Sequence, residues 1–301
     1  MKDRSTGIAL AFGAACISGF SVFLNSFAVK EFGDATLYTT AKNLVAAVLL
    51  VGIVALLARR GAASFTMPRN ARERIGLLVV GVVGGGVPFY LFFQGLAVTT
   101  STSAAFIQKT LVIWVAVLAV SFLRERFGLL HAAAIGLLVA GQAAASGGVG
   151  GFALDRGEAL VFIATLLWSV EVVVAKPLLR SLSPFTVAAA RMGIGIVVLL
   201  AIALATGAFA SLASITAGQW VWALVTGVVL TAYVTTWFSA LSRAQAVDVT
   251  AVLVFGAVIT AIISAGYRGT SLAPSAAGLA LITLGTLLIT ALALRRRPVT
   301  A

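Results

Sequence analysis

The sequence predicts an all-α integral membrane protein of ten transmembrane helices, arranged as two inverted five-helix repeats. Three observations lead to this prediction: an unusually apolar composition, ten apolar runs of membrane-spanning length, and an internal repeat. Of the 301 residues, 61% are hydrophobic and only 10% are charged. Soluble domains carry about a quarter of their residues as charged side chains. Most of this chain should therefore be surrounded by a lipid bilayer.

The apolar runs have the length that a membrane helix needs, which is about 20 residues. They must be helical, because an unpaired backbone amide in hydrocarbon costs several kcal/mol. In the first half of the chain the runs are residues 7–29, 35–57, 75–98, 102–123 and 128–146. In the second half they are residues 157–178, 185–205, 219–241, 248–267 and 273–294. The first run is too long for a cleaved signal peptide, so we expect it to remain as a span.

The internal repeat aligns the starts of the two halves at an offset of 150 residues, with small gaps further along. The aligned pairs include Gly7 with Gly157, Phe12 with Phe162, Lys42 with Arg191, and Gly141 with Gly285. Each half holds an odd number of spans, so the second half must be inverted relative to the first. Inverted repeats are typical of carriers that alternate access around a site near the midplane. The expected units are residues 1–147, an external linker at 148–156, and residues 157–301.

Basic residues indicate the orientation, because Lys and Arg near span ends are retained on the cytoplasmic side. With both termini placed inside, fifteen of the 21 Lys and Arg are cytoplasmic, three are external, and three lie within spans. The net charge of +12 is thus spread over short loops, which argues against a nucleic-acid partner. We expect a multi-pass protein of the bacterial inner membrane with cytoplasmic termini, acting as a monomer, with a homodimer left open.

Catalytic and metal-binding groups are scarce. One His and one Cys give no basis for a metal site, a cofactor or an enzymatic activity. Gly84–Gly86 lies inside an apolar span and forms no Walker pattern, so ATP-driven transport is not expected. A channel is the rival class, and it would differ from a carrier by non-saturating flux.

Several short motifs resemble one known family. They are Leu123-Arg124-Glu125-Arg126, Gly95-Leu96, Ala240-Leu241, Ser103-Ala104-Ala105, Val249-Thr250-Ala251, and the pair Gly141 and Gly285. Together they resemble the EamA-type families of the drug/metabolite transporter superfamily, over nearly the whole chain. The resemblance implies a secondary exporter of small zwitterionic metabolites, with amino acids favoured and aromatic ones preferred. Bacterial aromatic amino acid exporters are among the members nearest in layout. Drug, nucleotide-sugar and other metabolite carriers remain alternatives.

Two departures from the family pattern affect this interpretation. Gly269 stands where a second turn glutamate would be expected, and the prolines common in spans four and nine are absent. The first departure makes Glu125 a structural residue in our interpretation, anchoring a loop through Arg124 or Arg126. Whether export is facilitated diffusion or proton antiport is left open.

Polar residues within spans one and six are the first candidates for a substrate site. Ser18, Ser21 and Asn25 share one helix face, and the repeat places Trp168 and Glu171 opposite the two serines. We favour cavity lining, because an acid facing lipid would be costly. The alternative is that these side chains only hold neighbouring helices together.

Aromatic and amide residues provide a second candidate surface. Tyr90 and Gln94 share a face of span three, Tyr233 and Trp237 share a face of span eight, and Gln108 lies in span four. They could stack against a ring-bearing substrate, or they could be ordinary core packing.

Charged residues within spans suggest either coupling or an ion pair. Glu171 and Arg191 lie at similar depths, and we favour a structural ion pair between them over a role in proton coupling or amine binding. Lys42 is expected to snorkel to the outer end of its span. Lys109 could snorkel likewise, or face a substrate carboxylate beside Gln108. In span three, Gly86 and Pro88 are expected to form a kinked segment that acts as a gate.

Overall fold

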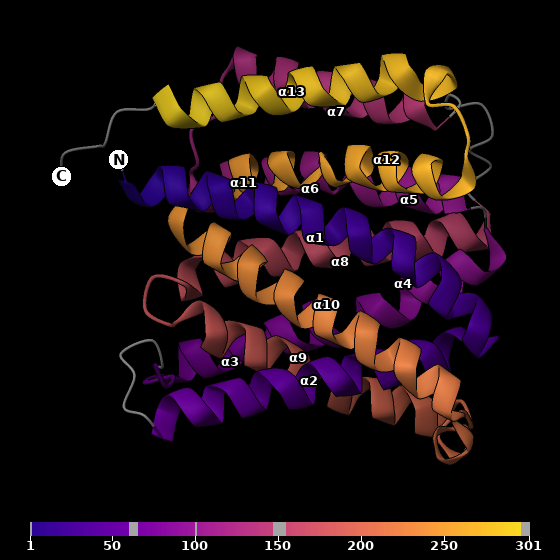
Figure 1. Ribbon diagram of the computed structural model, residues 1–301. Helices are drawn as coiled ribbons and strands as arrows, with labels where there is room; N and C mark the ends of the chain where they lie inside the picture. The colour runs from indigo at the N-terminus through magenta and orange to yellow at the C-terminus, as the bar shows by residue number, and fades with distance from the viewer. Residues whose placement is uncertain (1, 60–65, 100, 147–154, 296–301) are drawn as a thin grey trace.

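The computed structural model describes residues 2–59, 66–99, 101–146 and 155–295, and these residues form helices and short connections without any strand. Figure 1 shows the helices running side by side in one bundle. The start of α1 and the end of α13 lie at the same side of the bundle, which we call the terminal side. The other side is called the opposite side. The predicted linker at 148–156 lies almost wholly outside the described residues.

The first half of the chain contains five spans, two of which are made of more than one helical segment. Its elements are α1 (Lys2–Phe32), α2 (Ala35–Arg59), α3 (Ala71–Val79), the π-helical segment η1 (Val80–Gly86), α4 (Val87–Val98), α5 (Ser101–Lys109), α6 (Leu111–Leu123) and α7 (Leu129–Ala145). The third span is the continuous run α3–η1–α4, and the fourth is α5 with α6.

The second half repeats this pattern. Its elements are α8 (Arg156–Leu178), α9 (Pro184–Ala205), the short 3-10 turn η2 (Ala210–Ser214), α10 (Ala217–Arg243), α11 (Ala246–Leu253), α12 (Gly256–Arg268), the turn η3 (Ala273–Ser275) and α13 (Ala276–Arg295). The ninth span is α11 with α12.

The count of ten spans is confirmed within the described residues. Nine helical runs are long and apolar enough to cross a membrane. The tenth, α7, is apolar but has only 17 residues, which is at the short end of the roughly 17–25 that a span needs. The chain is thus a ten-helix integral membrane protein.

Helix packing follows the inverted repeat. α1 packs on α10, and its repeat mate α8 packs on α4. α2 packs on its own mate α9, and α7 packs on its mate α13 at one edge of the bundle (Figure 1). Each contact therefore has a partner related by the repeat, as a pseudo-two-fold axis requires.

Spans four and nine are both broken near their middles, although neither contains proline. The breaks lie at Thr110 and at Val254–Phe255. At both, backbone bonds reach only three residues back: Ile113 N–H bonds the Thr110 carbonyl at 2.9 Å, and Val258 N–H bonds the Phe255 carbonyl at 2.9 Å. A stretch of 3-10 bonding inside a helix often marks a hinge. Both spans are thus interrupted without a proline.

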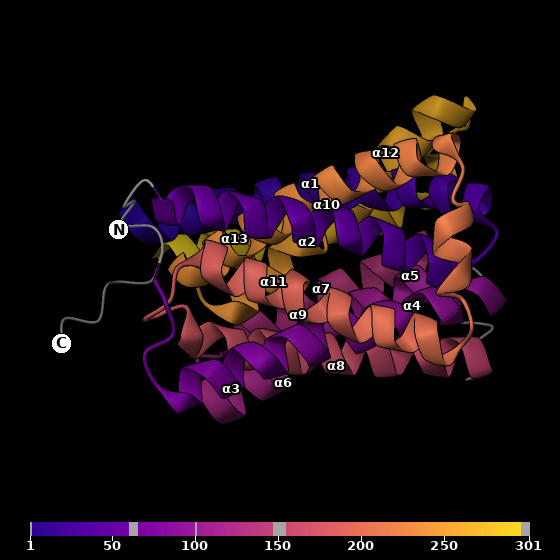
Figure 2. The same cartoon turned by 90° about the horizontal axis from the view of Figure 1, so that it is seen from below.

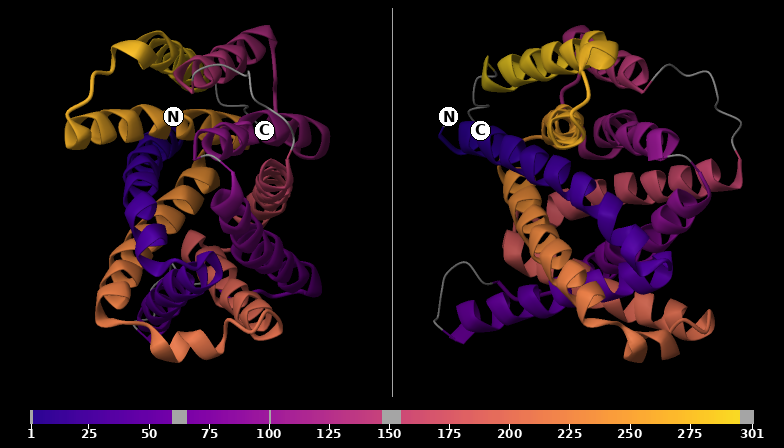
Figure 3. Two further views of the ribbon diagram at one scale, coloured as in Figure 1. Left: turned by 90° about the vertical axis from the view of Figure 1, so that its right-hand side faces the viewer. Right: turned by 45° about the vertical axis from the view of Figure 1, so that its right-hand side comes forward.

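The two broken spans meet at one side of the bundle only. On the terminal side α6 packs against α11. On the opposite side, within the described residues, α5 and α12 do not pack together in the same way. Figure 2 shows α12 rising away from α5 toward that side, and the left view of Figure 3 shows the bundle from its opposite side. The bundle is consequently closed between these spans on the terminal side and spread on the other.

Candidate functional site

An ion pair lies at the centre of the second half, between α8 and α9. Arg191 Nε is 2.5 Å from Glu171 Oε1, and Arg191 Nη2 donates to Glu171 Oε2 at 3.1 Å. Both side chains are buried. Two parallel bonds between a guanidinium and a carboxylate are the strongest geometry for such a pair. The predicted Glu171–Arg191 ion pair is present.

The glycine-rich segment η1 makes room for this pair. A Cβ on Gly84 would lie 2.1 Å from Glu171 Cδ, and one on Gly85 would lie 1.9 Å from the Arg191 carbonyl oxygen. The indole N–H of Trp168 donates to the Gly84 carbonyl at 3.1 Å. The segment is irregular, as expected, and Pro88 stands in the first turn of α4 directly after it. Its glycines serve close packing against α8 and α9.

Lys42 does not snorkel to the outer end of its span. It is 3% exposed, and its ammonium is surrounded by the rings of Phe93, Tyr38 and Phe89, with Nζ to centroid distances of 4.3, 4.9 and 5.6 Å. Within the described residues, no acceptor or acid bonds to this ammonium. Aromatic rings attract an ammonium group, but they are not conventional hydrogen-bond acceptors for its three N–H donors. Lys42 is therefore a buried amine that has no acidic partner among the described residues.

Phe89 connects this cation to the ion pair. The Arg191 guanidinium carbon lies 5.3 Å from the centroid of the same ring. The repeat mates Lys42 and Arg191 thus converge on one phenylalanine from the two halves. We call Lys42, Phe89, Glu171 and Arg191 the charged centre. It holds two basic side chains and one carboxylate, so among the described residues one basic side chain has no acid to pair with.

The polar face of α1 joins the charged centre through Tyr38. Asn25 donates to Ser21 Oγ at 3.3 Å, and the Tyr38 hydroxyl donates to Asn25 Oδ1. Ser18 lies half-buried one turn away. Among the described residues, no hydrogen bond joins Ser18 or Ser21 to Trp168 or Glu171. The predicted polar face is thus linked to the charged centre through the Tyr38 ring, which contacts Lys42.

Aromatic side chains surround the centre on two sides. Tyr233 and Trp237 are stacked, with centroids 6.3 Å apart and planes at 19°. Trp168 contacts Phe89 and Phe92, with centroids 5.5 Å apart in each case. Tyr233 also lies within electrostatic range of Glu171 and Arg191.

Four predicted residues lie apart from the charged centre. Tyr90, Gln108 and Lys109 are half-buried, and no hydrogen bond, ion pair or ring contact within the described residues joins them to it. Gln94 donates to Thr36 Oγ1 at 2.7 Å, which ties α4 to α2. Gln94 therefore matches the alternative in which polar residues hold helices together.

Two central residues were missed in the sequence. Tyr38 precedes Lys42 by four residues, which is one helical turn, so a search for neighbours of buried charges would have found it. Phe89 had no such signal, because an apolar ring in an apolar span looks the same whether it packs against lipid, protein or a cation.

Glu125 has structural partners at the start of α11. Its carboxylate accepts the backbone N–H groups of Ala246 and Val247 at 2.7 and 3.1 Å, at the start of α11. Lys176 donates to the carbonyls of Leu241 and Ala244 at the end of α10, at 2.5 Å each. Each charge matches the dipole of the helix end it touches. The α10–α11 turn is therefore held from both sides.

A model of the EamA-like transporter family matches residues 5–146 and, a second time, residues 155–291. No curated protein sequence matches. A solved structure titled "Crystal structure of protein" is similar in fold, with a TM-score of 0.69 and 16% sequence identity. The match covers 95% of this chain and 98% of the solved one. Within the described residues, no group of three His, Cys, Asp or Glu is placed to hold a metal ion.

Proposed function

This chain belongs to the EamA-like transporter family, and we propose that it exports small zwitterionic metabolites, above all amino acids, by alternating access across the bacterial cytoplasmic membrane. The observation that carries the proposal is the buried amine of Lys42, which has no acidic partner among the described residues although it lies beside a paired Glu171 and Arg191. Aromatic amino acids are the preferred substrates in this proposal.

The charge of the centre favours a substrate with a carboxylate. A buried cation is costly in a membrane protein unless an opposite charge or acceptor reaches it. A substrate carboxylate at Lys42 would satisfy its N–H donors and balance its charge. Glu171 is the acid within the same centre that a substrate ammonium could approach. An amino acid carries both groups, a combination that a simple organic anion or cation lacks.

The preference for aromatic side chains rests on the rings around the centre. Tyr233 and Trp237 are stacked, Tyr233 lies within electrostatic range of the ion pair, and Trp168 contacts Phe89. Aromatic pairs gain about 0.5–1.5 kcal/mol beyond their area burial. A ring on the substrate would extend these contacts.

Alternating access is supported by the arrangement of the broken spans. α6 and α11 pack on the terminal side, whereas α12 leans away from α5 on the opposite side (Figure 2). With both termini in the cytoplasm, as we propose, this conformation is closed to the cytoplasm. Rocking of residues 1–147 against residues 157–301 about the breaks at Thr110 and Phe255 would reverse it.

Counterflow in proteoliposomes tests the substrate class. Vesicles loaded with an unlabelled amino acid should accumulate the labelled one transiently, and a panel of the standard amino acids should compete, aromatic ones best. Flux that rises without saturation and shows no counterflow would indicate a channel. Absence of competition by every amino acid would contradict the substrate class, and drug-like and nucleotide-sugar compounds would then be tested.

Lys42→Met should weaken transport of the amino acid strongly while keeping the apolar volume of the side chain. We expect the KM to rise about tenfold to a hundredfold, because a charge-assisted hydrogen bond contributes about 1.5–3 kcal/mol. The measurement is counterflow with the amino acid and with its decarboxylated amine. Transport of the amine should not fall in Lys42→Met. An equal loss for both substrates would show that Lys42 does not bind the carboxylate.

Pro88→Ala should change transport kinetics if the segment from Gly86 to Pro88 acts as a gate. Pro88 has no backbone N–H, so one carbonyl of the preceding turn in η1 lacks the donor that a helix would normally supply. Alanine restores that N–H. We expect a lower maximal rate with little change in KM, because opening and closing would slow while the charged centre stays intact. Kinetics equal to those of the unmodified protein would count against the gate.

A further inference from the structure

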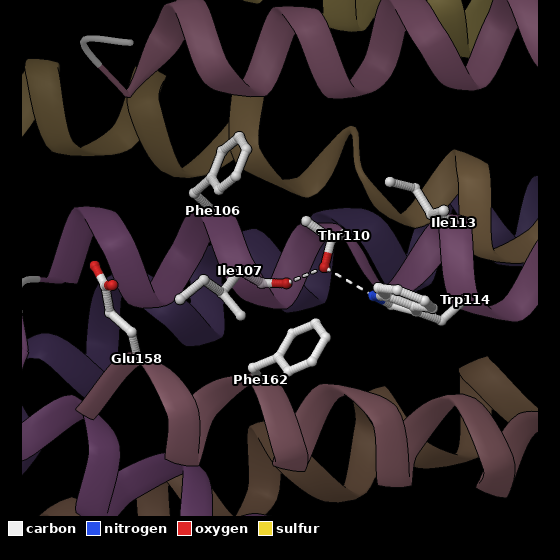
Figure 4. A pocket seen from close by; sticks show the side chains of 7 residues that line it. All are labelled: Phe106, Ile107, Thr110, Ile113, Trp114, Glu158 and Phe162. Atoms are coloured by element: carbon white, nitrogen blue, oxygen red, sulfur yellow. Dashed lines mark hydrogen bonds between the residues drawn. The ribbon is translucent and has the colours of Figure 1, made fainter. Parts of the chain in front are cut away.

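A cavity of about 190 Å³ lies away from the charged centre, between α8 and the broken span α5–α6 (Figure 4). Its walls are almost wholly apolar, and one acid stands among them. The lining residues are Phe106, Ile107, Thr110, Ile113, Trp114, Glu158 and Phe162. The cavity follows the face of the fourth span across its break at Thr110.

Glu158 is buried at one end of this cavity. It is 3% exposed, and its Oε2 has no hydrogen-bond partner within the described residues. Figure 4 shows its carboxylate reaching from α8 toward α5, beside Ile107 and Phe106. A buried carboxylate oxygen without a partner is expensive, so a ligand that supplies a donor or a positive charge there would be stabilised.

The repeat-related position in the first half is apolar. At the offset of 150, Glu158 corresponds to Ile8, which is 3% exposed in the core of the first half. A buried isoleucine therefore fills the equivalent position where only packing is needed. The glutamate carries a carboxylate that can recognise a cation, and the first half has no such group at the equivalent position.

The opposite end of the cavity is aromatic. The Trp114 and Phe162 rings meet edge to face with centroids 5.5 Å apart. The Trp114 indole N–H is already engaged by Thr110 Oγ1 at 3.3 Å, so this end offers a ligand only apolar surface (Figure 4). A matching ligand has an aromatic ring at one end and a positive charge at the other.

We propose that this cavity binds a small arylalkylammonium ion, with its ammonium at Glu158 and its ring packed against the exposed surfaces of Trp114 and Phe162. The volume suits one ring with a short arm, being smaller than the roughly 300–1,000 Å³ of most ligand pockets. Glu158 lies thirteen residues before Glu171 on α8, about 20 Å along the helix. The site is thus separate from the charged centre and does not depend on the proposed substrate.

Binding of radiolabelled phenethylamine to the purified full chain tests the proposal, in a maltoside detergent that carries no ammonium group. We expect saturable binding that weakens about tenfold to a hundredfold in Glu158→Gln, the loss expected for a charge-assisted hydrogen bond. Phenethyl alcohol, the neutral isostere, should compete more weakly than phenethylamine for the unmodified protein. In Glu158→Gln, phenethylamine and phenethyl alcohol should compete about equally. The comparison of the two ligands on the unmodified protein stands even if the variant fails to fold.

Glu31→Gln is the matched control, because Glu31 is an exposed glutamate near the opposite-side end of α1. It should leave phenethylamine binding unchanged. Equal affinity of the unmodified protein for the amine and the alcohol would overturn the proposal. The proposal would also be overturned if Lys42→Met lost phenethylamine binding while Glu158→Gln kept it, because that result would place the amine in the charged centre. Adding phosphatidylethanolamine tests a lipid source of the ammonium: if it displaces phenethylamine from the unmodified protein, the occupant is the lipid headgroup and the commitment to a free amine is wrong.

Discussion

Gly85→Ala is expected to prevent most of the protein from folding, the largest effect of any single substitution predicted for this chain. The new Cβ would lie 1.9 Å from the Arg191 carbonyl oxygen, with Gly195 Cα at 3.2 Å behind it. These are backbone atoms, so no side chain can turn aside, and α9 would have to move away from η1. Overpacking costs about 1–3 kcal/mol where side chains can adjust, and more where they cannot.

The measurement is the monodisperse yield on gel filtration in detergent, together with the Tm of the recovered protein. Gly52→Ala and Gly136→Ala are matched controls, because a Cβ at either position has no neighbouring atom within 4 Å. Both lie inside helices, where alanine is about 1 kcal/mol more favourable than glycine. We therefore expect the controls to keep or raise the Tm. A Gly85→Ala protein as abundant and as stable as these controls would show that η1 and α9 are not in such close contact.

Glu171→Gln should destabilise the protein by about 3–5 kcal/mol, because it leaves the Arg191 guanidinium buried without a counter-charge. Arg191 is 5% exposed, so water cannot replace the lost carboxylate. The free energy of unfolding in detergent measures this loss. Glu31→Gln, the same change at an exposed site, should alter it by less than about 0.5 kcal/mol.

The double variant Glu171→Gln with Arg191→Met separates a structural role from a coupling role. Replacing a buried ion pair by uncharged side chains is often close to neutral for stability, so the double variant should recover most of the loss. Its transport can then be measured under an imposed pH gradient. If Glu171 carries the coupled proton, the gradient effect should vanish in the folded double variant. A gradient effect that persists would leave Glu171 with a structural role only, and unchanged stability in Glu171→Gln would contradict the ion pair itself.

The spans and their breaks differ in how far they could be predicted. All ten spans follow from local hydrophobicity, including the short α7, because the cost of exposing polar backbone to lipid acts on each segment separately. The breaks at Thr110 and Phe255 did not follow, since no proline marks them. They arise where backbone hydrogen bonds join residues three apart instead of four apart. The spacing of apolar residues in the sequence does not reveal that change.

The charged residues show a similar division. Glu171 and Arg191 could be paired from their depths along adjacent antiparallel helices, and the pair is present. Lys42 was expected to reach the membrane surface, but the rings of Phe89 and Phe93 on α4 enclose it. Its position within α2 was known, whereas the helix packed against that face was not. Glu158 was not predicted as a site residue, because a glutamate in the first turn of a helix ordinarily faces solvent. Its burial depends on which helix packs against it, and the sequence does not show that.

The sequence by itself determined that this chain lies in a membrane, how many times it crosses, and that its halves are inverted copies, because these properties depend on hydrophobicity and repetition along one chain. Only the tertiary structure decided which buried charges are balanced. Among the described residues, Lys42 lacks an acid, Arg191 has one, and Glu158 keeps a carboxylate oxygen without a partner. Charge balance depends on distances of a few ångströms between side chains on different helices, and hydrophobic patterns specify the helices without specifying those distances.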